Sequence, residues 1–576
     1  MTRACAWLLA LALAVVATPA GAITLPEPGE PANVDKILAS MSLEEKVGQL
    51  MMIGFGGTRV TPKVRYWLRQ RRVGGVALFS RNIVDFAQTA AFTRELQAET
   101  AANVPIFVAL DQEGGNVVRV KDGAMLLPGN MALGATRSPT LAYVAGQSLA
   151  IDLRLLGFNM NLAPVLDVNS NPQNPVIGIR SYGERADLVA ELGAWYVRGQ
   201  QEMGVVAVAK HFPGHGDTQS DSHYAMPEIR ADLPRLEKVE LAPFRHAMTA
   251  GLDAIMTAHI ALPNVSEDPR LPATLSRRLL TDMLRRDMGF DGVVITDGLE
   301  MDGIVDNFGS GRAAVMAVLA GADMPMILWI PSKQEEVYRE LMAAVRSGEI
   351  PRARLDQSVR RILTVKARRG LFERKLEPLD VVLKTRNDNP VHQQVARQIA
   401  REAVTLVRNH GNVLPLRSVR YRKVVVVAPP GTFGRMLAEE PHVEVLTVPF
   451  IPSRDRRSED VTRAVEMARD ADLLMVAVVN RYHVTMAAKI MASVPQVPVA
   501  LLSFASPYYL TALPDVDAYV CTYSYLDVTQ TAAAQAVLGR APMTGRLPIS
   551  IPGFYGYGHR VEDQMAQVPS TSSSLR

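Results

Sequence analysis

The 576-residue sequence has very few cysteines and no strong excess of charge of either sign. It contains two cysteines, Cys5 and Cys521, and its 62 Lys and Arg residues against 58 Asp and Glu residues give a formal net charge of +4. Net charge alone therefore does not predict nucleic-acid binding. Cys5 lies in a segment that we expect to be removed, and one remaining cysteine cannot close an intrachain disulfide. The fold must be stabilised by its core, and hydrophobic residues make up 48% of the chain.

The hydrophobic run near the N-terminus is too short to span a membrane. A single cation, Arg3, precedes an apolar run at residues 5–17, and Ala20 and Ala22 form an A-x-A cleavage pattern. A transmembrane helix needs about 20 apolar residues. We therefore predict a cleaved signal peptide at residues 1–22 and an exported mature chain, periplasmic or secreted, without a membrane span. An uncleaved anchor is the alternative.

Residues 30–372 alternate short apolar runs with segments of helical period, as in a parallel sheet with crossover helices. The eight apolar runs are residues 50–55, 73–79, 104–110, 158–163, 205–211, 253–258, 292–296 and 322–327. This pattern predicts a (β/α)8 barrel of the TIM type, with its active site at the C-terminal ends of the strands. Polar residues stand at those ends: Asp111, Gln112, Glu113, Asp167, Lys210, His211, His259 and Asp297. Pro325 removes a backbone donor and predicts an irregular eighth strand.

A second, smaller α/β domain is predicted at residues 393–560, after a charged linker at residues 373–392 that is marked by Pro378 and Pro390. Its predicted strands are residues 423–428, 443–448, 473–479, 497–503 and 518–522, with a helix at 528–538. We expect an open, mostly parallel α/β sandwich. The first strand is not followed by a G-x-G-x-x-G turn, which argues against a dinucleotide site. Residues 561–576 are predicted to be a disordered tail.

The densest polar stretch, residues 210–223, contains three of the ten histidines. Two interpretations compete. In the first, a metal-dependent hydrolase binds its ion through this loop. The candidate ligands are His211, His215, Asp217, Asp221 and His223. In the second, Asp221 orients His223, which then gives and takes a proton near neutral pH.

This loop reads K-H-F-P-G-H-G and ends in D-S-H, and it resembles the loop of the glycoside hydrolase family 3 β-N-acetylglucosaminidases. Four further segments match that family in order: residues 111–115 with Arg119, residues 178–183, residues 292–297 and residues 355–372. The resemblance covers residues 37–372. It implies the barrel and the smaller α/β domain, with no cofactor and no metal.

The resemblance also implies residue roles. Asp297 is the nucleophile, His223 the acid/base and Asp221 its partner. The implied sugar-binding residues are Asp111, Arg119, Arg180, Lys210 and His211. A retaining glycosidase needs a carboxylate at the anomeric carbon and a proton donor at the leaving oxygen, and the strand end at Asp297 and the long loop at His223 suit these tasks.

Several of these residues could instead have a purely structural role. Asp111 could cap the following loop, Arg180 could pair with Glu184, and Lys210 could be a solvated charge. Asp167 and His259 fit either the pocket wall or the core. After Asp297 the chain reads Gly-Leu-Glu-Met, where these glucosaminidases commonly have a second Asp and then Leu-Ser-Met, so the local geometry there is expected to differ.

We therefore expect a retaining exo-β-N-acetylglucosaminidase that acts on cell-wall fragments or chitooligosaccharides through a covalent glycosyl-aspartate. The alternatives are a metal-dependent hydrolase and a non-catalytic sugar-binding barrel. The expected partner is a carbohydrate and not a nucleic acid. Because a neutral imidazole would not repel an anion, the acceptor is left open between water and phosphate. The sequence leaves the oligomeric state open.

Overall fold

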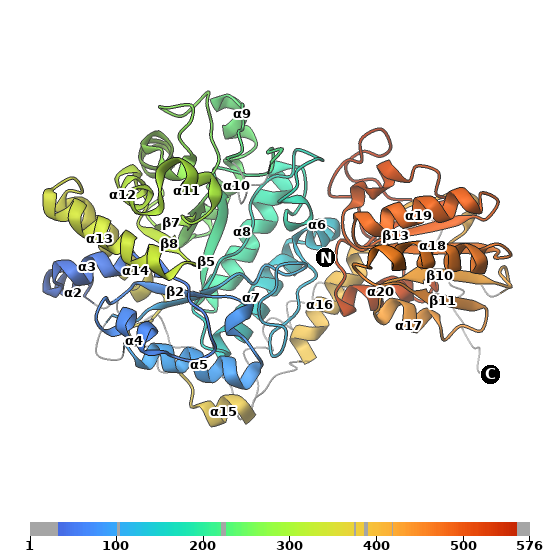
Figure 1. The fold of residues 1–576 in the computed structure, drawn as a ribbon, viewed down its shortest axis with the longest axis horizontal. Coiled ribbons are helices and arrows are strands. Elements are labelled where there is room, and N and C mark those ends of the chain that lie inside the picture. The colour runs from blue at the N-terminus through green and yellow to red at the C-terminus, as the bar shows by residue number, and fades with distance from the viewer. Residues whose placement is uncertain are drawn as a thin grey trace, which may run out of the picture.

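The chain folds into two domains that lie side by side along the long axis of the molecule (Figure 1). The computed structural model describes residues 33–100, 104–220, 226–373, 376–384, 390–416 and 419–561. The predicted signal peptide, the predicted tail beyond residue 561, and Asp221 and His223 lie outside these ranges. Among the helices in these ranges, none combines the length and apolar composition that a membrane span requires.

The first domain is a closed barrel of parallel strands, in which each strand pairs with the next in sequence and β8 closes on β1. The strands are β1 Met52–Ile53, β2 Gly75–Leu78, β3 Phe107–Leu110, β4 Met160–Asn161, β5 Val206–Phe212, β6 Ala254–Thr257, β7 Val293–Gly298 and β8 Met324–Ile327. Each coincides with one of the predicted apolar runs, so the (β/α)8 prediction is confirmed. The register of β7 against β8 is irregular between Ile295 and Gly298, in agreement with the expectation from Pro325.

Helices surround the barrel and follow its strands. They are α4 Pro62–Arg69, α5 Phe86–Ala98, α7 Pro139–Leu155, α8 Ala186–Glu202, α10 Ala242–Thr249, a π-helix Arg278–Asp287, α12 Ser310–Ala320 and α13 Pro331–Ser347. The side chains of Thr61, Asp85 and Ser138 each accept a backbone N–H in the first turn of α4, α5 and α7. These caps satisfy donors that the helix itself leaves unpaired, and they explain where the helices begin.

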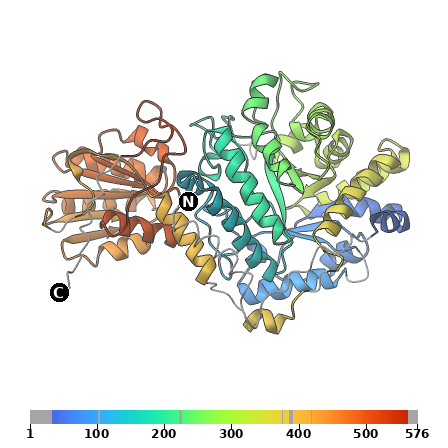
Figure 2. The ribbon, with the colours of Figure 1, turned by 180° about the vertical axis from the view of Figure 1, so that it is seen from behind.

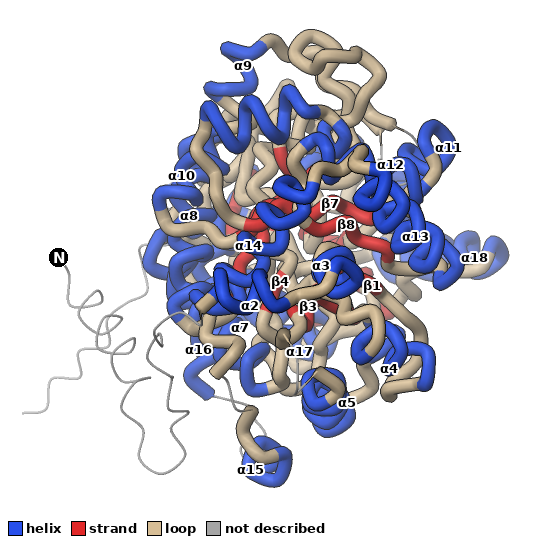
Figure 3. Tube along the Cα trace, turned by 90° about the vertical axis from the view of Figure 1, so that its left-hand side faces the viewer, coloured by secondary structure: helices blue, strands red, loops and turns tan. Residues whose placement is uncertain are grey.

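Three helices cover the end of the barrel at which the strands begin (Figure 3). They are α2 Val34–Ser40, α3 Leu43–Gln49 and α14 Arg352–Arg368. Ile362 and Val365 of α14 join the apolar cluster inside the barrel. The Lys366 amino group donates to Oε1 of Gln49, just before β1, at 2.8 Å. The end of the barrel at which the strands begin is thus closed, and the end at which they finish carries the polar loops.

The second domain is built on one sheet with the strand order β11-β10-β12-β13-β14-β9. The strands are β9 Thr405–Asn409, β10 Val424–Ala428, β11 Val443–Thr447, β12 Leu473–Val478, β13 Val499–Ser503 and β14 Ala518–Cys521. All pairs are parallel except that of the edge strand β9, which runs antiparallel to β14. The mostly parallel sheet is confirmed, and β9 is a strand that the sequence analysis did not predict.

Helices cover both faces of this sheet. They are α16 Pro390–Ala403, α17 Thr432–Leu437 and α20 Asp527–Val537 on one face, and α18 Arg454–Ala468 and α19 Arg481–Ser493 on the other. Alternate residues of β10 separate the two cores: Val424 and Val426 pack with the first group, Val425 and Val427 with the second. This period of two is what a strand buried on both faces requires. Cys521 ends β14 as a buried free thiol.

The stretch that was predicted to be a linker contains ordered helix. The helix α15 Leu379–Lys384 lies inside it, and α16 begins there at Pro390. Pro378 directly precedes α15, so both prolines stand at helix starts, where the missing N–H costs no hydrogen bond.

The two domains contact each other through α16, the yellow helix between them in Figure 2, and through segments on both sides of β14 in sequence. The helix α16 packs against α7 and α6 Asn130–Thr136 of the barrel and against α20 of its own domain. The His392 ring bonds Asp152 of α7 through Nδ1 and Oδ1 at 2.7 Å. Glu184 of the barrel accepts the backbone N–H of Ser550 at 2.7 Å and its hydroxyl at 2.6 Å.

Candidate active site

A buried network of charged side chains lies at the C-terminal end of the barrel strands. The ammonium group of Lys210, in β5, is 2.7 Å from Oδ1 of Asp111 and 2.7 Å from Oε1 of Glu113. Arg180 binds Glu113 with two hydrogen bonds, Nε to Oε2 at 2.9 Å and Nη2 to Oε1 at 2.8 Å. Arg119 reaches Oδ2 of Asp111 from Nη2 at 3.3 Å. The structure thus brings together four of the five predicted sugar-binding residues.

Glu113 is at the centre of this network, although it was not among the predicted binding residues. Burial disfavours its ionised form, but the Arg180 guanidinium and the Lys210 ammonium outweigh burial and hold its pKa well below the ordinary range. Burial likewise opposes the charge on Lys210, and Asp111 and Glu113 reverse the effect and raise its pKa. The site is therefore a set of mutually paired charges in which Glu113 and Lys210 are almost fully buried, so electrostatic interactions between them are strong.

Two of the structural alternatives that the sequence offered, a solvated Lys210 and an Arg180–Glu184 pair, are wrong. Lys210 is 2% exposed and so is not a solvated charge. Arg180 pairs with Glu113, while Glu184 holds Ser550 of the other domain. The carboxylate of Asp111 accepts from two cationic side chains.

His211, the fifth predicted binding residue, is oriented by Asp167 from the loop after β4. Its Nδ1 lies 2.7 Å from Oδ2 of Asp167, and its backbone N–H donates to Oδ1 at 3.1 Å. Asp167 is completely buried, which opposes ionisation, yet His211 and the neighbouring His215 keep its pKa below the ordinary value. An ionised Asp167 requires a proton on Nδ1 of His211, so Nε2 is the remaining ring nitrogen for a substrate hydroxyl.

Of the two strand-end residues that the sequence left open between pocket wall and core, Asp167 is completely buried and holds the His211 ring. The other residue, His259, is core: it is 1% exposed and bonds Thr274 through Nδ1 at 2.8 Å and the Gly298 carbonyl through Nε2 at 3.0 Å.

The first part of the histidine loop is fixed against the barrel. The backbone N–H of His215 donates to Oδ1 of Asp167 at 2.6 Å, and its Nδ1 lies 2.8 Å from the Thr218 hydroxyl. Burial lowers the pKa of His215 to about 4, so the ring is neutral at pH 7. A Cβ on Gly216 would lie 1.7 Å from the carbonyl oxygen of Val168, so this close approach requires glycine.

Asp297, the predicted nucleophile, is in β7 and is partly exposed at the same end of the barrel. Its Oδ1 accepts the backbone N–H of Gly298 at 2.7 Å, which fixes the carboxylate on a rigid element. Asp221 and His223 lie outside the described residues, so the predicted acid/base pair stays a prediction. Within the ranges that the structure describes, no cluster of three His, Cys, Asp or Glu side chains is arranged to hold a metal ion.

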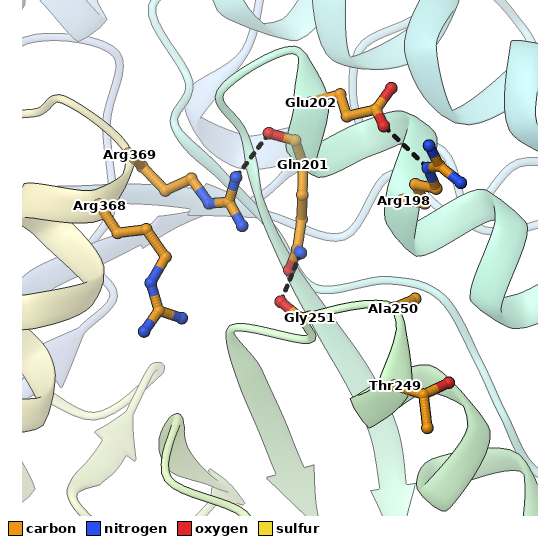
Figure 4. Close-up of a pocket in the computed structure, with 8 residues that line it drawn as sticks. All are labelled: Arg198, Gln201, Glu202, Thr249, Ala250, Gly251, Arg368 and Arg369. Atoms are coloured by element: carbon orange, nitrogen blue, oxygen red, sulfur yellow. Dashed lines mark hydrogen bonds and ion pairs between the residues drawn. The ribbon is translucent and has the colours of Figure 1, made fainter. Parts of the chain in front are cut away.

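A cavity of about 510 Å³ lies at the opposite end of the barrel from this site, where α8, α10 and α14 end (Figure 4). Three arginines line it, but they already have partners. Arg198 bonds Glu202, and Arg369 bonds Asp253 and the backbone oxygen of Gln201. Arg368 is 3.3 Å from Asp253. Cations at helix C-termini are favourable for the helix dipole, which accounts for these arginines.

Comparison with known proteins places the barrel in a family. The model described as "Glycosyl hydrolase family 3 N terminal domain" matches residues 42–365. Beta-hexosaminidase A of Pseudoalteromonas piscicida is 33% identical over 383 residues, which are 62% of this chain and 63% of that protein. Beta-N-acetylglucosaminidase/beta-glucosidase of Cellulomonas fimi is 30% identical over 550 residues, which are 89% of this chain and 94% of that protein.

A solved structure extends the match to both domains. The glycoside hydrolase family 3 beta-N-acetylglucosaminidase from Paenibacillus sp. str. FPU-7 is similar with a TM-score of 0.82 at 37% sequence identity, covering 89% of this chain and 99% of that chain. The match to the family model spans the barrel with its charged network and Asp297. This chain belongs to glycosyl hydrolase family 3.

Proposed function

We propose that this protein is a retaining exo-acting β-N-acetylglucosaminidase that removes terminal N-acetylglucosamine from cell-wall fragments or chitooligosaccharides. The observation that carries the proposal is the buried network of Asp111, Glu113, Arg119, Arg180 and Lys210 beside a strand-end carboxylate. The names of the three relatives indicate the same substrate class.

In the proposed reaction the terminal sugar is held by the charged network. Lys210, Arg119 and Arg180 donate to its hydroxyl and acetamido oxygens, and Asp111 accepts from its hydroxyls. Because these groups are held in place by each other before substrate binds, little ordering is needed when the sugar enters. Nε2 of His211 lies on a ring that Asp167 orients, and it bonds a further hydroxyl.

Asp297 then attacks the anomeric carbon and forms a glycosyl ester, while His223 gives its proton to the leaving oxygen. In the second step of the reaction a water molecule attacks the same carbon, His223 takes a proton from the water, and the Asp297 carboxylate is released. The Gly298 N–H at Oδ1 keeps the carboxylate oriented through both steps.

The experiment that tests the proposal is the comparison of the parent with Asp297→Asn on an aryl N-acetyl-β-glucosaminide. Loss of a nucleophile that starts the reaction is expected to lower kcat by about 10³-fold or more. Asp302→Asn, in the nearby helix α11 Asp302–Phe308, is the matched control and should leave kcat unchanged. Parent-like activity in Asp297→Asn would overturn the proposal.

We also propose that the protein is exported, because residues 1–22 have the features of a cleaved signal peptide. N-terminal sequencing of protein recovered from the periplasm or the medium should begin at Ile23. A protein retained in the cytoplasm with Met1 in place would contradict export.

A further inference from the structure

Trp329, two residues after the end of β8, is a large aromatic side chain that is fixed in place and yet 53% exposed. Its ring centroid lies 4.4 Å from that of Phe79, which follows β2, and the two planes make an angle of 46°. The Arg81 guanidinium lies 4.1 Å from the centroid of the Trp329 ring and 4.6 Å from that of Phe79. The indole is therefore supported by a ring and a cation at the end of the barrel that carries the active site.

Glu300 fixes the backbone that presents this indole. Its carboxylate accepts the backbone N–H groups of Leu328 at 2.5 Å, Trp329 at 2.8 Å and Ile330 at 2.5 Å. Glu300 is three residues after Asp297 and, with Gly298, is one of the two positions at which this sequence departs from the commoner Asp-Leu-Ser-Met of the family it resembles. The carboxylate that replaces the short hydroxyl thus couples the strand of the nucleophile to the turn of Trp329.

The aromatic pair adjoins the charged network of the active site. The Phe79 ring has the Arg119 guanidinium 5.7 Å from its centroid, and Arg119 pairs with Asp111. Phe79 is only 7% exposed, whereas half of the Trp329 surface is open. Trp329 is therefore at the rim, one side chain further out than the groups proposed to hold the terminal sugar.

We propose that Trp329 is a specificity-determining residue that binds the leaving-group sugar, the pyranose ring on the far side of the scissile bond. This inference rests on the proposed function. A pyranose ring has an apolar C–H face that packs on an aromatic ring, and an indole fixed by Glu300, Arg81 and Phe79 loses little conformational freedom when it binds. An exposed aromatic ring beside a polar pocket is a common feature of ligand sites.

The test compares two substrates that share the N-acetylglucosamine unit and differ in the leaving group, methyl N-acetyl-β-glucosaminide and N,N′-diacetylchitobiose. Trp329→Ala should lower kcat/KM for the disaccharide roughly tenfold through a higher KM, and should change kcat/KM for the methyl glycoside less than about twofold. Trp329→Phe should recover most of the loss. Glu300→Gln should also lower the kcat/KM for the disaccharide relative to that for the methyl glycoside, by a smaller factor than Trp329→Ala does.

Ile330→Ala is the matched control, since Ile330 is on the same turn and is 44% exposed, and it should leave the ratio of the two kcat/KM values unchanged. Equal losses on both substrates, or no loss on either, would overturn the inference while the parent's activity upholds the proposed function. If the parent hydrolyses neither substrate, the proposed function fails and this inference fails with it.

Discussion

Glu113 shows how the site depends on one buried carboxylate. It accepts from both Arg180 and Lys210, and it is 3% exposed. The sequence predicted the residues around it because they stand at strand ends or in matching segments. It did not predict Glu113 as their common partner, because β3, β5 and the loop after β4 meet only when the barrel closes. The sequence signals for it were its place at the end of an apolar run and in the Asp-Gln-Glu-Gly-Gly segment, and neither shows which cations it binds.

The substitution Glu113→Gln is expected to lower the free energy of unfolding by about 3 kcal/mol, because it leaves Arg180 without its carboxylate and Lys210 with Asp111 as its remaining one. The folded-state pKa of Glu113 lies well below its ordinary value of 4.5, so its contribution is complete above that pH and is lost as the pH falls toward the folded-state pKa. The gap in melting temperature between parent and variant should therefore be constant above pH 5 and should narrow below it. Thermal melts at several pH values measure this gap.

Glu237→Gln is the control for this experiment, since the Glu237 side chain is 54% exposed and should change the melting temperature very little at any pH. A gap for Glu113→Gln that widens on acidification would contradict the assigned charge state.

His223 is predicted to protonate the leaving oxygen, and the leaving group tests that role. His223→Ala should lower kcat/KM by about 10³-fold for a methyl glycoside, whose alkoxide leaves poorly, and less than about tenfold for a dinitrophenyl glycoside, which needs no proton. Steady-state kinetics on the two substrates give the comparison. His246→Ala, at an exposed position of α10, should alter neither. Equal losses on both substrates would argue against His223 as the donor.

At the scale of the elements, the sequence predicted the strands of both sheets but not β9. The apolar runs of the barrel strands are separated by clear helical segments, whereas β9 follows α16 after only one residue and joins the sheet at its edge. An antiparallel edge strand is decided by long-range pairing with β14, which local periodicity does not show. The helix α15 was missed because its six residues are too few to show a helical repeat of apolar residues.

The helix α14 places an amine in the closed end of the barrel. Lys366 is fully buried, and burial lowers its pKa well below the ordinary value of 10.5. At pH values between the lowered pKa of the folded state and 10.5, the unfolded chain binds more protons than the folded chain. The free energy of unfolding of the parent therefore rises with pH in this range.

Lys366→Met keeps the length of the side chain and removes the amine. It should raise the free energy of unfolding by about 1 kcal/mol at pH 7, and the gain should shrink as the pH approaches 10. Chemical denaturation at pH 7 and pH 9.5 measures it. Lys238→Met, at an exposed position, should show no such trend. A gain that grows with pH would mean that the buried amine is charged.

At the scale of the whole molecule, the barrel and the second domain share a contact that the sequence did not indicate. The helix α16 packs on α6 and α7, and Glu184 binds the backbone and the hydroxyl of Ser550. The Asn169 amide near the site donates to the Tyr508 hydroxyl of the second domain at 3.0 Å. Sequence patterns describe each domain separately, so they did not show that the second domain reaches the loops around the site.

This contact predicts that the two domains unfold together. Scanning calorimetry of the whole chain should show one transition, and Glu184→Ala should lower its midpoint by about 1–2 °C as a single peak, because larger proteins shift less per kcal/mol. Glu191→Ala, on the exposed surface of α8, is the control. Two well-separated transitions in the parent would contradict the coupling.

The most direct test of the central claim is the mass-spectrometric capture of the glycosyl-enzyme with a fluorinated N-acetylglucosaminide. A retaining mechanism at a strand-end carboxylate predicts one added sugar per chain, located by peptide mapping on the peptide that contains Asp297. Absence of a covalent adduct in an active enzyme, or an adduct on another residue, would contradict the account.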